Sequence, residues 1–246
     1  MQHLLRKQIK LVGILMVSCL SLNAQKNEVF QPDHDDLPYY LGISMGYGIN
    51  NLNFQRNAFF TGTMADVANQ LTASNSGNAL LGLTGTLKLT DHFLLRANPM
   101  LLIGGSKSFK FHVNSDNDYI SLPSNIISLP LALKMQSDRY NAFGYRAMMR
   151  HYVFVGGKAD FDLSSTKEVL SDYKVLPYKA LLNGNDFGYE FGLGLSFYLR
   201  YVTISPEIKF SYGLTNLKNS TPTEHLLDHV NKVNANFVYF TIQIEN

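Results

Sequence analysis

The sequence predicts an all-β protein, an eight-stranded antiparallel outer-membrane β-barrel of the up-and-down type. In residues 187–199 and 202–214, large apolar side chains occupy every second position, which is the period of a β-strand. The positions between them are small or charged, and the segments are about twice as long as an average soluble strand. Strands of roughly 9–11 residues with an apolar outer face and a polar inner face are typical of membrane barrels.

Eight segments show this alternation. The expected strands are residues 39–49, about 79–89, about 93–103, about 126–135, about 143–163, 187–199, 202–214 and 236–244. The third segment resumes its alternation at Phe109, Phe111 and Val113, which leaves the end of that strand open between residues 103 and 113. Connections alternate between short and long, so short turns are expected in the periplasm and long loops outside the cell.

The long connections are residues 50–77, 104–125, 164–185 and 215–235, and the sequence predicts that all four lie at one end of the barrel. Short helices are expected near Met64–Leu71 and Thr223–Val230, and residues 114–125 are expected to form a loop. An even number of strands places both termini in the periplasm. Pro99, Pro130 and Pro206 fall inside strand segments, so β-bulges are expected near them.

Residues 1–24 have the pattern of a secretory signal peptide. Arg6, Lys7 and Lys10 precede an apolar run at 11–20, which is too short for a membrane helix. Cleavage is expected between Ala24 and Gln25. Met16–Cys19 also resembles a lipobox, so a lipoprotein signal is the alternative. Cys19 is the only cysteine, and its removal would exclude disulfides, thiolate metal sites and a cysteine nucleophile from the mature chain.

Residues 25–37 are polar and acidic, and we expect a short, disordered periplasmic lead before a barrel domain at 38–246. His34 is flanked by Asp33, Asp35 and Asp36, a group that could contact a metal ion if a scaffold held it.

Charged residues on the small-residue faces are expected to fill the lumen of so narrow a barrel. The predicted lumen network consists of Arg96, Lys134, Arg146, Glu190, Glu207 and Lys209. A turn at residues 200–201 would place Glu190 diagonally opposite Lys209. The network is interpreted as structural, because buried charges must pair or meet water; a proton or ion path is the alternative.

The residues predict no catalytic, cofactor-binding or metal-binding site. His225 and His229, with Asp228 between them, would share one face of a helix and could form a weak metal site, but a solvated loop helix is the commoner arrangement. No glycine-rich phosphate loop is present in the sequence, and a net charge of +2 gives no indication of a nucleic-acid partner. The expected surroundings are outer-membrane lipids.

Several segments resemble the PorT family of Bacteroidetes outer-membrane proteins. They are LPYYLGISMGYGINNLNF at 37–54, SLPLALKM at 128–135, FVGGKADFDLSS at 154–165, and the ordered set DFGYE, SPEIKFS and GLTNL between 186 and 217. The resemblance spans most of the mature chain. Residues 145–151 (YRAMMRH) depart from it as extra sequence before FVGGK.

This resemblance implies a non-enzymatic accessory role in the type IX protein secretion system, and in gliding where a bacterium glides, with other secretion components as partners. It implies no enzymatic motif. Two other functions stay open: a passive structural or adhesive barrel, and a lipid-modifying barrel enzyme with a Ser-His or Asp-His arrangement near the outer rim.

Overall fold

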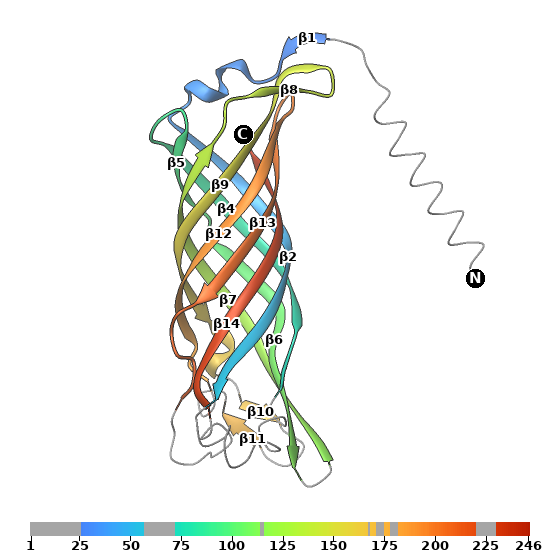
Figure 1. Cartoon of the computed structure of the whole chain (residues 1–246), viewed down its shortest axis with the longest axis vertical. Helices are drawn as coiled ribbons and strands as arrows, with labels where there is room; N and C mark the ends of the chain where they lie inside the picture. Colours follow the sequence, from blue (N-terminus) through green and yellow to red (C-terminus); the bar gives the residue numbers. More distant parts are fainter. Residues whose placement is uncertain are drawn as a thin grey trace, which may run out of the picture.

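A computed structural model describes residues 26–56, 72–113, 116–166, 168–170, 175–177, 182–219 and 230–246. Its main feature is a closed ring of eight antiparallel strands (Figure 1). In chain order the ring consists of β2 (Tyr39–Arg56), β4 (Ser76–Lys88), β5 (Phe93–Ala97) continued by β6 (Met100–Val113), β7 (Asp116–Gln136), β9 (Tyr145–Asp162), β12 (Asn185–Tyr198), β13 (Thr203–Gly213) and β14 (Val230–Glu245). The predicted fold class and strand number are confirmed.

The ring closes between the first and last of these strands. β14 pairs with β2 along its length, with Phe240 opposite Tyr47. Every other pair joins strands that are consecutive in the chain, which is the up-and-down topology. Closure leaves no exposed strand edge in the described wall of the barrel, so the backbone groups of the wall are paired within it.

Seven short elements of the described residues lie outside the ring's main strands. They are β1 (Lys26–Val29), η1 (Pro32–Asp36), β3 (Thr72–Ser74), β8 (Tyr140–Ala142), η2 (Leu163–Thr166), β10 (Glu168–Leu170) and β11 (Val175–Pro177). β1, β8 and the C-terminus lie at one end, and β10, β11 and the β6–β7 hairpin lie at the other (Figure 1). The described parts of all four long connections are at this second end, as predicted. The helices expected at Met64–Leu71 and Thr223–Val230 fall largely outside the described residues.

Residues 104–113 and 116–125 are strand, which makes the expected loop at 114–125 wrong for its described part. β6 and β7 continue as a paired hairpin as far as Val113 and Asp116. A one-residue shift occurs between Leu102 and Gly105, and Gly104 has a φ of 80°, a conformation that favours glycine. The bulge reverses which residues point inward, so Lys107 faces the lumen.

The prolines do not cause the bulges that the sequence suggested. Pro130 pairs with Lys158 and Pro206 with Ile242, each in an unshifted register. At the junction of β5 and β6, the carbonyl of Pro99 accepts a hydrogen bond from Leu83 N at 3.0 Å. Pro130 and Pro206 therefore lack only their own N–H, and the register of the ladder around them is unchanged. Pro99 lies where β5 ends and β6 begins, and its carbonyl is still hydrogen-bonded to the neighbouring strand.

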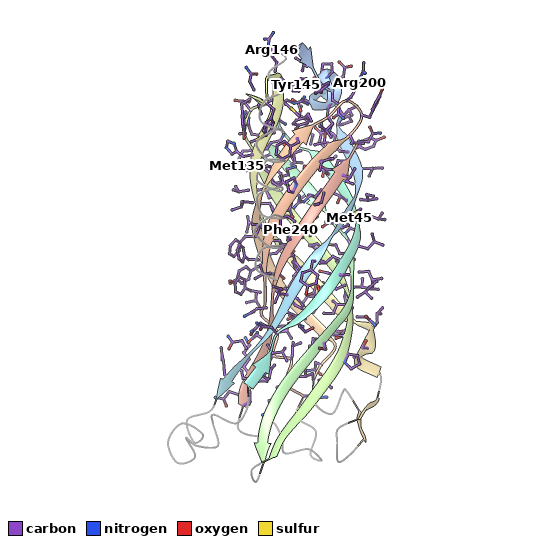
Figure 2. All side chains as sticks on the ribbon, turned by 90° about the vertical axis from the view of Figure 1, so that its right-hand side faces the viewer. Met45, Met135, Tyr145, Arg146, Arg200 and Phe240 are labelled. Carbon is purple, nitrogen blue, oxygen red and sulfur yellow. The ribbon has the colours of Figure 1, made fainter. Side chains whose placement is uncertain are left out.

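Large apolar side chains cover the outside of the central part of the barrel, as Met45, Met135 and Phe240 illustrate in Figure 2. They come from every long strand; examples are Leu41 and Ile43 of β2, Leu81 and Leu83 of β4, Leu131 and Leu133 of β7, Val153 and Val155 of β9, and Phe191 and Leu193 of β12. So large a continuous apolar surface is expected to face lipid rather than water.

Toward the long-loop end, the inside and outside of the barrel exchange polarity. After Ile49, β2 directs Leu52 inward and exposes Asn51 and Asn53. Val233 and Phe237 of β14 also point inward and join Leu52 in an apolar core. Polar side chains outside and apolar side chains inside are the arrangement of a protein surrounded by water. The barrel therefore extends beyond the lipid band at this end. No helix of the described residues is long and apolar enough to cross a membrane.

Candidate functional site

The centre of the lumen holds a buried ion pair. Arg96 of β5 and Glu207 of β13 meet at 2.7 Å, and both side chains are almost completely buried. Glu207 also accepts a hydrogen bond from the Tyr152 hydroxyl at 3.1 Å. The Arg96 guanidinium lies 4.5 Å from the centre of the Phe154 ring, so one face of the cation packs against an aromatic ring.

Two further cations of the predicted network lie close to this pair. Lys209 Nζ is 3.4 Å from Glu190 Oε1, and the register of β12 and β13 places Lys209 opposite Gly192, diagonal to Glu190. Lys134 Nζ lies 4.0 Å from the centre of the Tyr152 ring. Five of the six predicted residues therefore face the lumen: Arg96, Lys134, Glu190, Glu207 and Lys209.

Arg146 does not belong to the lumen, and that prediction is wrong. The β8–β9 hairpin carries Arg146 beyond the rim, where its side chain is exposed at the end of the molecule (Figure 2). Ala147 has a φ of 49°, which interrupts the strand alternation between Arg146 and the wall. Arg150, further along the same strand, is its buried arginine.

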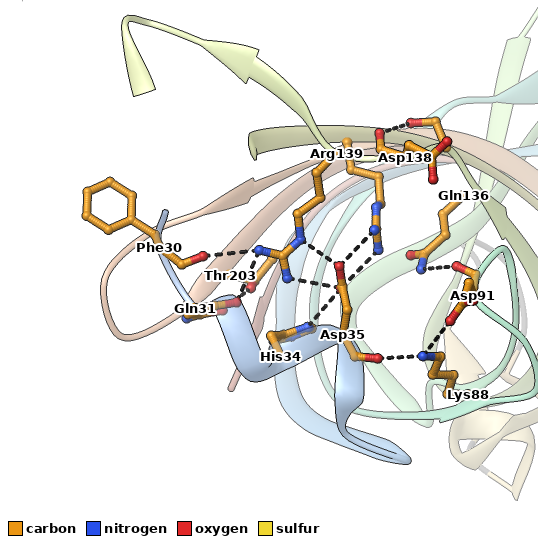
Figure 3. A network of polar contacts seen from close by, with 12 residues as sticks. Phe30, Gln31, His34, Asp35, Lys88, Asp91, Gln136, Asp138, Arg139 and Thr203 are labelled. Carbon is orange, nitrogen blue, oxygen red and sulfur yellow. Dashed lines mark hydrogen bonds and ion pairs between the residues drawn. The ribbon is translucent and has the colours of Figure 1, made fainter. Parts of the chain in front are cut away.

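The lead folds over the lumen at the short-turn end, although a disordered terminus was expected. Gln31 turns the chain with a φ of 47°, and η1 then places Asp35 between two arginines (Figure 3). Asp35 forms ion pairs with Arg139 at 2.9 Å and with Arg150 at 3.1 Å. Arg139 also donates to the carbonyls of Phe30 and Gln31, both at 3.1 Å. We call residues 30–37 the cap.

Aromatic contacts and further polar contacts hold the cap to the rim. The buried His34 ring stacks on Tyr40 with 4.2 Å between centroids and meets the edge of Tyr198. Lys88 donates to the carbonyl of Asp35 (Figure 3). The rings of Tyr40 and Tyr198 pack against His34, and Lys88 holds the backbone of Asp35, so these contacts fix the cap on the rim.

Charge around Asp35 favours its ionised form. Burial alone would raise the pKa of Asp35, but the contact with His34 and the charges of Arg139 and Arg150 outweigh it, so the pKa lies well below its usual range. The carboxylate is thus a permanent anion at physiological pH, and the cap is held by charge-assisted contacts.

Carboxylates and lysines form a second polar cluster toward the long-loop end, which the sequence pattern did not predict. Lys107 Nζ lies 2.9 Å from Asp162 Oδ2, and Lys158 pairs with Asp160. Asp186 of β12 also points inward. The residues of β9 alternate clearly enough to reveal this cluster in retrospect, but Lys107 could not be assigned without knowing the bulge at Gly104.

Apolar side chains close the lumen beyond this cluster. Leu182 and Leu217, from the segments that precede β12 and follow β13, are fully buried in the apolar core with Leu122 and Val233. Asn183 N donates to the Leu217 carbonyl at 2.7 Å, and Leu182 forms an isolated antiparallel β-bridge with Lys218. We call residues 182–185 and 214–219 the roof.

The site as a whole is a packed interior between a cap and a roof. The exposed fraction is 2% or less for three of its charged residues, Arg96, Glu207 and Lys209. This burial is expected because the interior of an eight-stranded barrel is just wide enough for side chains. Such an interior has no room for a folded protein. Among the described residues, no group of three or more His, Cys, Asp or Glu side chains is placed to hold a metal ion. His225 and His229 lie outside the described part of the chain, as do Cys19 and the expected cleavage position between Ala24 and Gln25.

Comparison with known proteins agrees with this architecture. The family described as "Outer membrane protein beta-barrel domain" matches residues 23–219, and the chain belongs to that family. Membership indicates an integral protein of the outer membrane. No curated protein matches the sequence.

Several solved structures are similar to the chain at low identity. Neisserial surface protein A is 6% identical, with 85% of this chain and 97% of that chain covered and a TM-score of 0.44. OprG from Pseudomonas aeruginosa is 13% identical, with 85% and 94% covered and a TM-score of 0.40. The protease OmpT from Escherichia coli is 11% identical, with 90% and 99% covered and a TM-score of 0.41. We draw no functional conclusion from these similarities.

Proposed function

We propose that this protein is a non-enzymatic accessory component of the type IX protein secretion system, acting through contacts with other secretion components. The observation that carries the proposal is the location of the PorT-like segments. FVGGKADFDLSS supplies Lys158, Asp160 and Asp162; DFGYE supplies Asp186 and Glu190; SPEIKFS supplies Glu207 and Lys209; and GLTNL supplies the roof residue Leu217. The resemblance therefore lies in the residues that fill and close the lumen, as well as in generic strand alternation.

In this proposal the protein supports secretion by contacting other components and does not conduct cargo through its lumen. The lumen is filled by paired side chains, the cap covers one end and the roof lies across the other. A barrel of this width has no path for a folded cargo protein. Its contribution to export is then to bind or position the machinery that carries the cargo.

The long-loop end is the surface we assign to that contact. The barrel extends beyond the lipid band there, and a hollow of about 430 Å³ opens between the roof and η2, lined by Ser165, Asn183, Asn185, Phe187 and Thr215 among others. In this proposal both termini and the cap lie in the periplasm, and the long loops lie outside the cell. The short-turn end, with its exposed Arg146 and Arg200, is the second available surface.

Deletion of the gene tests the proposal. We expect type IX cargo to disappear from the culture supernatant and to return when the intact gene is supplied on a plasmid. Normal export by the deletion strain would contradict the proposal and favour the passive structural or adhesive barrel.

A separate variant tests the enzymatic alternative. We expect His225→Ala combined with His229→Ala to leave export unchanged, because the proposal gives these histidines no chemical role. Loss of export, with the protein present in the outer membrane at its normal level, would support an enzyme or a metal site instead.

A further inference from the structure

Two aspartates face each other inside the lumen near the roof. Asp186 of β12 is the direct cross-strand partner of Asp160 of β9. Both side chains point inward, with exposed fractions of 5% and 4%. Directly opposed residues of an antiparallel pair have Cβ atoms about 4.5–5.5 Å apart, and like charges at that distance are destabilising.

The two carboxyl groups differ in their partners. Asp160 accepts hydrogen bonds from Ser128 on one oxygen and from Lys158 on the other. Asp186 Oδ1 accepts a hydrogen bond from Thr215 N at 3.3 Å, whereas its Oδ2 is buried without a hydrogen-bond partner among the described residues. An ionised carboxylate left in this state would be costly.

Asp186 borders a small cavity that is lined by apolar side chains of the roof and β14 and also by Lys107, Asp160 and Asp162. Gly213 of β13 lies against the Asp186 carboxyl, and a Cβ atom there would collide with Oδ2. Leu217 of the roof and Ala235 and Phe237 of β14 line the same region. A cavity of about 10 Å³ lies among these residues, close to the smallest that holds one water molecule.

The charged groups of this cluster do not balance within the described residues. The three carboxyl groups belong to Asp160, Asp162 and Asp186, and the two amino groups to Lys107 and Lys158. Lys107 contacts Asp162 and Lys158 contacts Asp160, which leaves one negative charge in excess if all three carboxyl groups are ionised. Toward the centre of the lumen, the centre of the Tyr239 ring of β14 lies 6.0 Å from Lys209 Nζ, and Lys209 is paired with Glu190. A phenol has an ordinary pKa of about 10, so Tyr239 adds no charge to this count.

We propose that Asp186 is a proton-binding site at neutral pH, with the proton held on Oδ2, the oxygen that lies against Gly213 and has no hydrogen-bond partner among the described residues. The neutral carboxyl group removes the repulsion across the strand pair and balances the cluster. Its Oδ1 still accepts from Thr215 N, so the contact between the barrel wall and the roof is kept in the protonated form. The inference does not depend on the secretion role, because it rests only on the lumen geometry.

Infrared spectroscopy of the mature protein, refolded into lipid, tests the proposal. We expect wild type at neutral pH to show a carbonyl band of a protonated carboxyl group that is lost in Asp186→Asn. Asp91→Asn is the matched control, because Asp91 is exposed and lies outside this cluster, so its removal leaves the Asp186 proton in place. Identical spectra of wild type and Asp186→Asn in this region would overturn the proposal.

Two further measurements distinguish a bound proton from a required anion and from a bound metal cation. Asp186→Asn imitates the neutral acid, so it should refold with wild-type yield; failure to refold while wild type succeeds would mean that an anion is required. Sodium and calcium chloride, added separately, should not raise the thermal stability of wild type over that of Asp186→Asn. A selective stabilisation by either salt would identify a bound metal cation and contradict the proton.

Discussion

Arg96 and Glu207 are 111 positions apart in the sequence, and the closed barrel brings them to 2.7 Å in a completely buried environment. Removing one member of the pair is strongly destabilising, because the other member stays buried and charged without a partner. The pair therefore depends on the barrel being closed with the correct register.

Glu207→Ala should lower the free energy of unfolding by about 3–5 kcal/mol, the usual cost of removing one partner of a buried ion pair. Arg96→Met combined with Glu207→Leu should cost less than the single change, since no charge is then left alone. Asp91→Ala, at the exposed pair with Lys88, is the control and should cause no measurable change. Urea unfolding in detergent micelles measures all three, and equal losses for the single and double variants would argue against a paired lumen.

Leu193→Arg should destabilise the folded barrel by about 2–4 kcal/mol, because Leu193 lies in the apolar band on the lipid side of β12. Leu214→Arg, at the long-loop end, should cost much less, since the penalty falls toward the interface. The two leucines are matched in exposure, at 55% and 58%. Refolding into lipid vesicles gives both free energies, and similar values would contradict the assigned depth of the band.

At the scale of whole elements, the central parts of all eight strands could be predicted, because lipid outside and charge inside impose a strict period of two. The strand ends could not. After Ile49 the chain still alternates, but with Leu52 inward and Asn51 and Asn53 outward. A search for strands with an apolar outer face takes such a segment, with its polar outer face, for a loop. For the same reason, the strands predicted from the sequence are shorter than β6 and β7.

Leu52→Ala should therefore lower the free energy of unfolding by about 2–5 kcal/mol, the range for removing a large apolar side chain from a packed core. Asn53→Ala, its neighbour on the outer face of the same strand, should be close to neutral. Chemical unfolding of the purified barrel compares them. Equal effects would mean that this part of β2 does not enclose an apolar core.

The cap could not be predicted for a different reason: its residues are polar and non-periodic, and its order comes from contacts with Arg139, Arg150, Tyr40 and Tyr198 that no local pattern reveals. Among the lumen residues, Arg146 was assigned wrongly because the positive φ of Ala147 cannot be inferred from an alanine. The other five could be predicted because a charged residue on the small-residue face of a membrane strand must point into the lumen rather than into lipid.

Asp35→Asn should loosen the cap, and Asp33→Asn, which changes an exposed neighbour, should not. The chain has no tryptophan, so Phe30→Trp provides a single fluorescent reporter beside Tyr145. We expect a red shift of the emission in the Asp35→Asn background alone. The same emission in both backgrounds would show that the ion pairs do not hold the cap.

The pH dependence of the cap follows from the lowered pKa of Asp35. A carboxyl group whose folded pKa is depressed contributes its full stability above its unfolded pKa of about 4 and loses it as the pH falls through the folded value. The reporter should therefore be constant from neutral pH down to about pH 4 and shift only in stronger acid. A transition centred near neutral pH would contradict the assignment to Asp35.

At the scale of the whole molecule, the apolar band, the packed lumen, the cap and the roof together describe a closed outer-membrane barrel that projects beyond the lipid at its long-loop end. A closed barrel can serve secretion only through its surfaces. The decisive question is whether the long-loop end can be altered without disturbing the barrel and yet affect export.

The most direct measurement replaces residues 167–181 by a short turn and quantifies type IX cargo in the culture supernatant. The replacement keeps Ser164 and Leu182, whose buried side chains belong to η2 and the roof. Heat-modifiable mobility on gels and outer-membrane fractionation establish that the variant folds and reaches the membrane. We expect a folded barrel at its normal level with strongly reduced export; a folded barrel with wild-type export would contradict a contact role for this surface.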